Sequence, residues 1–311
     1  MQLIRTYNIP KKAYDSVIVI GNFDGVHLGH QSVIKNARFL AKKYEKKLGI
    51  LTFEPHPKSF FGEKLYDFRI TPFRSKFEAL KNLDLDFYIN IKFDDDFSKL
   101  SAEDFVFRIL VKKMKVFYVV TGLDFVFGYK QSGNTDLIKK ISFESKLFSF
   151  SQVEVIRERK YKISSSEIRK FLSKGELSKV EKILGRNWSI ISRVVRGERR
   201  GRKIGFPTAN FNIKKFSDLC FGVYKVVIKF KSDLSNKEYN GIANYGIKPT
   251  FKNMTPVLEV NIFDFEKNIY GELLEVIFIS FIRKEKKFNS LDELKVQIKK
   301  DIEMCKKDKN D

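Results

Sequence analysis

Residues that form disulfides or bind metals are scarce in this chain, which has two cysteines and three histidines among 311 residues. Cys220 and Cys305 are far apart in the sequence and lack the spacing of metal ligands. Neither a disulfide framework nor a cysteine-based metal motif is therefore indicated. Two isolated cysteines fit a protein that works in a reducing compartment.

Long hydrophobic runs are also absent. The longest early run, Val17–Ile20, is far shorter than a signal-peptide core of about 7–15 residues or a membrane span of about 20 residues. We therefore expect a cytoplasmic protein with no membrane partner. The hydrophobic fraction of 43% is that of an ordinary globular chain, and the length allows two compact domains.

Acidic residues are outnumbered, so that the formal net charge is +22. The lysines and arginines are spread along the whole chain and interleaved with acids, without a long basic block. This distribution favours solvated basic faces and attraction to polyanionic phosphates. Dedicated nucleic-acid binding is an alternative that the charge alone leaves open, although we expect no nucleic-acid partner.

The N-terminal half alternates strand-like and helical patterns, which predicts an α/β domain with a parallel sheet. A helix is expected from about 30 to 47, and another begins at Ser101 with Asp104 in a capping arrangement. Ligands of such sheets bind beyond the carboxyl ends of the strands, here after Ile20, Phe53 and Val120. The expected strands cover 16–20, 48–53, 87–91 and 116–121.

The C-terminal half changes to a series of strands without intervening helices, which predicts a small antiparallel β-barrel. The expected strands cover 188–195, 223–230, 239–244, 258–265 and 273–282. A closing helix over 290–304 carries Leu291, Leu294, Ile298 and Ile302 on its apolar side. We place the domain boundary after a short helix at 176–184, which divides the chain into domains 1–184 and 185–311.

Two of the three histidines lie between the first predicted strand and helix, in the pattern His27-x-Gly29-His30. At a helix start, two imidazoles and backbone N–H groups converge where the helix dipole favours anions. Gly29 allows a phosphate to approach the backbone closely. This pattern predicts a triphosphate site, although a single surface histidine usually has no function.

Two further segments have phosphate-binding character. Ser164, Ser165 and Ser166 open a short helix with Arg169 one turn in, although a serine run of this kind is commonly only a helix cap. Glycines recur every fourth residue from 197 to 205 among arginines and lysines. This glycine loop is followed by Thr208 and Asn210, whose oxygens can face one Mg²⁺. Taken alone, such a loop is more often a solvated turn.

The segments 22–30, 52–57, 122–128 and 163–169 together resemble the FMN adenylyltransferase half of the prokaryotic bifunctional riboflavin kinase/FAD synthetase family. The resemblance implies a Rossmann-like nucleotidylyl transferase domain in which the FMN phosphate attacks the α-phosphate of ATP. It implies catalytic roles toward the phosphates for His27, His30 and Arg169. It implies ATP or phosphate binding by Gly21, Phe23, Gly29, Ser164, Ser165 and Ser166. It implies flavin or nucleotide contacts for Pro55, His56 and Asp124. One departure is Val126, where many members have arginine.

The segments 205–210, 221–224, 243–251, 258–265 and 270–271, with Arg283 and Phe288, resemble the riboflavin kinase half of the same family. The resemblance implies that Thr208 and Asn210 hold Mg²⁺ and that Glu259 is the general base. A carboxylate suits this role, because the riboflavin 5′-hydroxyl is a poor nucleophile until its proton is accepted. The other implied contacts are phosphate binding by Gly201, Lys203, Gly205 and Pro207, and flavin binding by Arg283.

The sequence therefore predicts a transferase that makes FMN from riboflavin and FAD from FMN, with ATP as co-substrate and Mg²⁺ as cofactor. One alternative is a riboflavin kinase with a weakened adenylyltransferase site, which the valine at 126 suggests. A nucleic-acid-binding protein and a flavin carrier without ATP dependence are alternatives from other classes. We expect a monomer or a weak oligomer.

Overall fold

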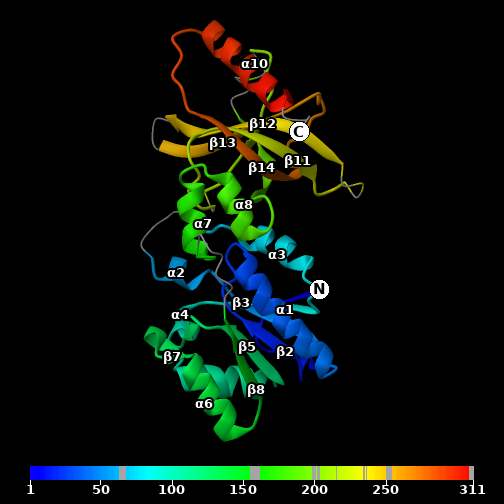
Figure 1. The fold of residues 1–311 in the computed structure, drawn as a ribbon, viewed down its shortest axis with the longest axis vertical. Coiled ribbons are helices and arrows are strands. Elements are labelled where there is room, and N and C mark those ends of the chain that lie inside the picture. Colours follow the sequence, from blue (N-terminus) through cyan, green and yellow to red (C-terminus); the bar gives the residue numbers. More distant parts are fainter. Residues whose placement is uncertain are drawn as a thin grey trace. The chain divides into compact units, whose positions relative to one another are not determined.

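The computed structural model describes residues 1–62, 68–154, 162–197, 201, 204–214, 216–233, 235, 237–249 and 254–307. The chain forms two compact units, shown as a ribbon in Figure 1. Unit 1 consists of Met1–Leu65 and Lys76–Ser164, and unit 2 of Tyr66–Ser75 and Ser165–Asp311.

Unit 1 contains a six-stranded sheet in the order β1-β4-β3-β2-β5-β8, and every neighbouring pair is parallel. The strands are β1 (Gln2–Ile4), β2 (Val17–Ile20), β3 (Leu48–Glu54), β4 (Phe87–Lys92), β5 (Tyr118–Gly122) and β8 (Ser149–Val153). The predicted parallel α/β domain is confirmed. The sequence pattern missed the two edge strands, because β1 has only three residues and β8 alternates serine with other residues.

Helices and short turns connect these strands. The longer helices are α1 (Leu28–Lys43), α3 (Phe73–Lys81), the π-helix η2 (Phe105–Lys113) and α6 (Thr135–Ser145). The short elements are η1 (Lys11–Ala13), α2 (Pro57–Phe60), α4 (Asp95–Ser98), α5 (Ala102–Asp104) and η3 (Tyr129–Gln131), with a hairpin of β6 (Val126–Phe127) and β7 (Gly133–Asn134). The helix predicted at Ser101 is confirmed, since the Ser101 hydroxyl accepts a hydrogen bond from the Asp104 amide at 3.0 Å.

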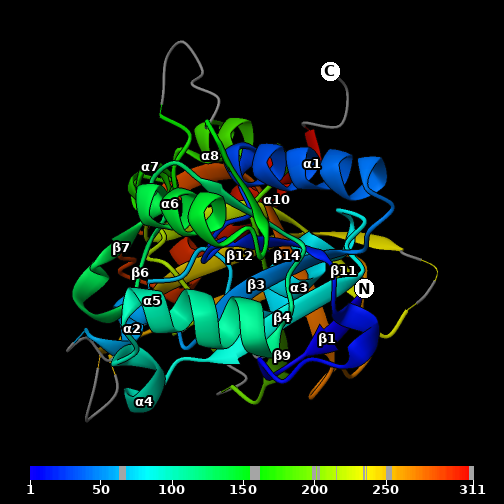
Figure 2. The same cartoon turned by 90° about the horizontal axis from the view of Figure 1, so that it is seen from below.

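Alternation along β2 assigns the helices of unit 1 to two faces of the sheet. Ile18 and Ile20 belong to one core cluster with Phe105 of η2 and Ile138 of α6. The alternate residue Val19 points to the opposite face, where α1 packs on β2, β3 and β5. Figure 2 shows α1 on one side of β3 and β4 and the helical segment of α5 and η2 on the other. A doubly covered sheet explains why β2 is apolar at every position.

Unit 2 is built on a closed antiparallel barrel in the order β10-β13-β12-β11-β14-β9. Its strands are β9 (Ser189–Val195), β10 (Ala209–Phe211), β11 (Gly222–Phe230), β12 (Glu238–Pro249), β13 (Met254–Ile262) and β14 (Leu273–Lys284). Its helices are α7 (Ser165–Leu172), α8 (Leu177–Leu184) and α10 (Leu291–Lys307). The predicted barrel with a terminal helix is confirmed. The sequence pattern missed β10, which is only three residues long.

A segment from the first half of the sequence completes unit 2. The Trp188 indole is 2% exposed and donates to the carbonyl of Ile70 at 3.0 Å, and the Ser217 amide donates to the carbonyl of Arg69. The compact units therefore divide differently from the predicted domains 1–184 and 185–311, since α7 and α8 belong with the barrel. Those domains stay a prediction about where the two activities separate along the chain.

A buried ion pair fastens α10 to the barrel. Arg283 of β14 donates through Nε and Nη2 to the carboxylate of Asp301, at 2.8–3.0 Å, and Asp301 is 2% exposed. One turn earlier, Gln297 donates to the same carboxylate at 2.8 Å. The predicted amphipathic helix is thus confirmed, with one correction at its start. Leu291 is 64% exposed, because the contacts of α10 with the barrel come from its later turns.

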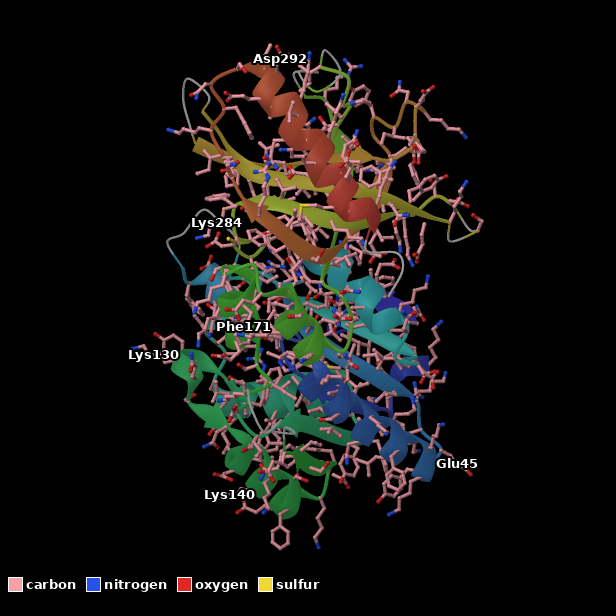
Figure 3. The ribbon with its side chains drawn as sticks, turned by 45° about the horizontal axis from the view of Figure 1, so that its top comes forward. Glu45, Lys130, Lys140, Phe171, Lys284 and Asp292 are labelled. Atoms are coloured by element: carbon pink, nitrogen blue, oxygen red, sulfur yellow. The ribbon has the colours of Figure 1, made fainter. Side chains whose placement is uncertain are left out.

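We expect Asp301→Ala to release α10 from the barrel, because removal of one partner of a buried ion pair costs about 3–5 kcal/mol. Hydrogen exchange of the α10 amides should show a loss of protection of about 100-fold or more. The control is Asp292→Ala in the first turn of the same helix, labelled in Figure 3, whose side chain is 92% exposed. Equal protection in the two variants would contradict a fastening role for Asp301.

Candidate active sites

The loops that follow β2, β3 and β5 leave the sheet of unit 1 at the same edge. These strands are neighbours, with Ile20 paired to Leu51 and Val19 paired to Val120. Parallel strands end on the same side, so the histidine loop after β2 lies next to the loops that carry the other predicted residues of unit 1.

The loop between β2 and α1 has an unusual backbone. Phe23 and Val26 have positive φ values of 49° and 46°, and Gly25 has a φ of 90°. A left-handed conformation is rare for a β-branched residue and costs on the order of 1–3 kcal/mol. Phe23 and Val26 are 3% and 1% exposed, so packing of their side chains holds this backbone in place. Strained, well-packed loops of this kind gather at functional sites.

The two histidines of the predicted triphosphate site lie against each other. Their rings are stacked with centroids 3.6 Å apart, and the ring of Phe23 lies 5.1 Å from that of His30. His27 is the N-cap of α1, where its Nδ1 accepts the His30 amide at 3.2 Å. One of the amides expected to face a phosphate therefore already has a partner. The site has two imidazoles at the positive end of a sixteen-residue helix.

The remaining predicted residues of unit 1 lie around this loop or on its neighbours. His56 is buried and caps α2, with Nδ1 accepting the Lys58 amide at 3.1 Å. Pro55 and Asp124 are exposed after β3 and β5. The two predicted glycines are closely packed. Gly29 is buried in the first turn of α1, and a Cβ added to Gly21 would lie 3.0 Å from the Phe23 ring.

Lys76 is a residue of this region that the sequence did not single out. It is 1% exposed, and its Nζ donates to the carbonyl of Asn22 at 2.7 Å. No signal in the sequence identifies it, because the chain holds 60 lysines and arginines and only burial separates Lys76 from the rest.

The serine motif falls at the division between the units. Ser164 closes unit 1, whereas Ser165, Ser166 and Arg169 belong to unit 2. In unit 2, Arg169 donates through Nε to the carbonyl of Phe68 at 2.8 Å, with its guanidinium 4.7 Å from the Phe68 ring centroid. The role of the motif toward phosphates stays a prediction.

In the barrel, strand register brings Glu259 between two asparagines. Glu259 of β13 lies directly opposite Asn210 of β10 and Asn244 of β12. Directly opposed residues share one face of a sheet. The flanking Leu258 and Val260 are 0% and 1% exposed, so they fill the barrel interior and the polar row lies on its outer face. Glu259 is half-buried in this row, and Asn244 is a member that the sequence reasoning missed.

Two described glycines of the glycine loop, Gly197 and Gly201, lie directly against the predicted metal ligands. A Cβ added to Gly197 would lie 2.4 Å from Nδ2 of Asn210, and one added to Gly201 would lie 3.2 Å from the Thr208 hydroxyl. Only glycine permits this approach of backbone to side chain.

The other residues predicted to contact phosphate in this segment are Lys203, Gly205 and Pro207. Gly205 has a φ of 90°, and the carbonyl of the exposed Pro207 accepts from Asn261 at 2.7 Å. Lys203, predicted to contact phosphate, lies outside the described residues.

The oxygen atoms of Thr208 and of the polar row on the outer face of the barrel suit a magnesium ion that also binds phosphates. Thr208 and Asn210 supply neutral oxygens, and Asn210 is only 7% exposed beside the Glu259 carboxylate. Mg²⁺ is commonly held by few protein oxygens together with substrate phosphates. The described residues include no group of three histidines, cysteines or acids that could form an all-protein metal site.

Unit 2 contains a cavity of about 650 Å³, one of whose lining residues contacts this row. Glu285 is part of its wall and hydrogen-bonds to Asn244, which connects the cavity to the Glu259 row. Burial raises the pKa of the Glu285 carboxyl, and burial together with Asp218 raises the pKa of Tyr245 to about 12. The Tyr245 hydroxyl therefore stays protonated, and its ring lies 5.0 Å from that of Phe221. The cavity offers aromatic surface with a few polar groups, as ligand pockets do.

Arg283, predicted to bind flavin, has its donors engaged within the barrel. Besides its ion pair with Asp301, its Nη1 donates to the carbonyl of Lys284 at 2.9 Å, at the end of β14 labelled in Figure 3. The guanidinium also lies 5.9 Å from the ring centroid of Phe288. These contacts fasten α10, and a flavin contact for Arg283 stays a prediction.

Family models match both halves of the chain. The model described as FAD synthetase matches residues 9–167, and the model described as riboflavin kinase matches residues 184–308. A bifunctional riboflavin kinase/FMN adenylyltransferase of Buchnera aphidicola subsp. Schizaphis graminum is 40% identical, over 99% of this chain and 98% of that protein. A protein of the same name from Haemophilus influenzae is 38% identical over 98% of each chain.

A crystal structure described as a macrolide-efflux protein from Streptococcus pneumoniae matches 98% of both chains, with 30% identity and a TM-score of 0.84. In the part of this chain that the structure describes, no helix has the length and apolar character to span a membrane. The range matched by the FAD synthetase model contains the histidine loop, and the range matched by the riboflavin kinase model contains Asn210, Asn244 and Glu259. The chain therefore belongs to the family of bifunctional riboflavin kinase/FMN adenylyltransferases.

Proposed function

We propose that the chain phosphorylates riboflavin to FMN in the barrel and transfers AMP from ATP to FMN in the N-terminal domain, releasing pyrophosphate. The observation that carries this proposal is the placement of Glu259 between Asn210 and Asn244, next to a glycine loop and a cavity. The family membership of both halves supports the same pair of reactions.

In the kinase reaction, Glu259 accepts the proton of the riboflavin 5′-hydroxyl as its oxygen attacks the γ-phosphorus of ATP. The bond from this phosphorus to the β-phosphate oxygen breaks, and ADP leaves. Thr208 and Asn210 would hold Mg²⁺, which when bound offsets the negative charge of the phosphates. Gly201, Lys203, Gly205 and Pro207 are proposed to contact the ATP phosphates.

The cavity beside Asn244 is the proposed flavin site of the kinase. Its volume of about 650 Å³ falls within the range of about 300–1,000 Å³ that small-molecule pockets occupy. Phe221 and Tyr245 offer ring surface to the isoalloxazine, and the Tyr245 hydroxyl offers a hydrogen bond.

In the adenylyl transfer, a phosphate oxygen of FMN attacks the α-phosphorus of ATP, and the bond to the β-phosphate breaks. His27 and His30, at the N-terminus of α1, would bind the phosphates and stabilise charge that develops at the α-phosphorus. Ser164–Ser166 and Arg169 are proposed to bind the leaving pyrophosphate. We also propose a cytoplasmic enzyme with domains 1–184 and 185–311 that acts as a monomer or a weak oligomer.

The purified chain supplied with riboflavin, ATP and Mg²⁺ should form FMN first and FAD afterwards, as followed by chromatography over time. FMN that accumulates without FAD would instead support the kinase-only alternative, with Val126, which is 48% exposed on β6, as the first residue to restore to arginine. If neither product forms, the proposed function is wrong.

Glu259→Gln should lower the rate of FMN formation by about 100–10,000-fold, because the substituted amide cannot accept the hydroxyl proton. The same variant should convert supplied FMN to FAD at the wild-type rate. Glu266→Gln, at an exposed glutamate in the turn after β13, is the matched control and should leave both rates unchanged. A Glu259 variant that loses both activities together would contradict the separate role of the barrel.

His30→Ala should produce the opposite pattern, with FAD formation from supplied FMN reduced by about 100–1,000-fold and FMN formation retained. Steady-state rates of both reactions measured on one preparation provide the comparison. Lys35→Ala, at an exposed position of the same helix, is the control that should change neither rate. Retention of FAD synthesis in His30→Ala would remove the histidine from the proposed mechanism.

A further inference from the structure

A buried lysine lies behind the histidine loop of unit 1. Lys76 belongs to α3 and is 1% exposed, although lysine is among the residues least often fully buried. Burial of an ammonium group is costly unless hydrogen bonds and charge compensate it. Its Nζ donates to the backbone carbonyl of Asn22 at 2.7 Å, the distance of a charge-assisted hydrogen bond.

The carbonyl that Lys76 binds belongs to the most constrained stretch of the site. Asn22 directly precedes Phe23, the first of the residues with positive φ that lead to the N-cap His27. Such a backbone persists only where surrounding contacts over-determine it. The Lys76 hydrogen bond fixes the loop at Asn22, and the contact between the rings of Phe23 and His30 fixes it further along.

We propose that Lys76 is a positioning residue for adenylyl transfer. Its ammonium holds the Asn22 carbonyl, and through it the turn that presents His27 and His30, and it places a fixed positive charge behind a loop that receives a triphosphate. This inference rests on the proposed function of the N-terminal domain. Lys76 acts through the loop, so it affects both the binding of ATP and the geometry of the transfer.

The test compares three substitutions in the full chain. Lys76→Met removes the charge and the donor, Lys76→Gln keeps a neutral donor, and Lys76→Arg keeps both. In assays of FAD formation from FMN, Lys76→Met should lower kcat/KM for ATP by about 100-fold, the size of effect that small misplacements of reacting groups produce. The change should include a rise in KM, and Lys76→Arg should recover more activity than Lys76→Gln. Lys81→Met, at the exposed end of α3, should match the wild type.

Riboflavin kinase activity of the same preparations separates this role from a general loss of folding. A partly unfolded preparation lowers the apparent kcat and leaves KM unchanged, so a rise in KM with an intact kinase supports positioning. Wild-type KM for ATP in both Lys76→Met and Lys76→Gln would overturn the inference. If Lys76→Met does not fold, the KM for ATP of Lys76→Gln is compared with that of Lys76→Arg. A higher KM in Lys76→Gln supports the inference, and equal wild-type values overturn it. Absence of FAD formation by the wild type would instead refute the proposed function.

Discussion

Side-chain alternation along β13 is the constraint on which the barrel site depends. Leu258 and Val260 must face the closed interior, which sends Glu259 to the outer face. The antiparallel register then places it opposite Asn210 and Asn244. A shift of one residue would bury the carboxylate among apolar side chains and move both asparagines away from it. The chemistry of this site therefore follows from the closure of the barrel.

The site of unit 1 depends on a different constraint, the backbone of one short loop. Between the end of β2 and the start of α1 the chain must reverse direction and present two histidines at a helix N-terminus. It does so with left-handed residues at Phe23 and Val26, which tight packing maintains. The imidazole of His27 serves as a helix cap at the same time, so the functional group and the structural group are one residue.

Each unit contains a buried charged side chain that holds one segment of that unit in place. A charged side chain is buried where it can satisfy groups of the backbone or an opposite charge. In unit 1 Lys76 holds a carbonyl of the histidine loop, and in unit 2 Arg283 holds Asp301 of the terminal helix. Buried charges of this kind contribute little net stability compared with apolar packing, but their hydrogen bonds hold the segments that they join in one geometry.

The longer strands of each half and several helices could be predicted from sequence patterns, because hydrophobic periodicity and turn residues are local properties. The helices α3 and α6 were not predicted. The candidate site residues His27, His30 and Glu259 could also be identified from sequence, the histidines from their spacing at a helix start and the acid from its place within an apolar strand. Short or edge strands such as Gln2–Ile4 and Ala209–Phe211 were not, since their pairing comes from neighbours distant in the sequence. Tertiary structure alone decided that Asn244 joins Glu259 and that Lys76, one of many lysines, is buried, because register and burial are set by contacts between distant segments.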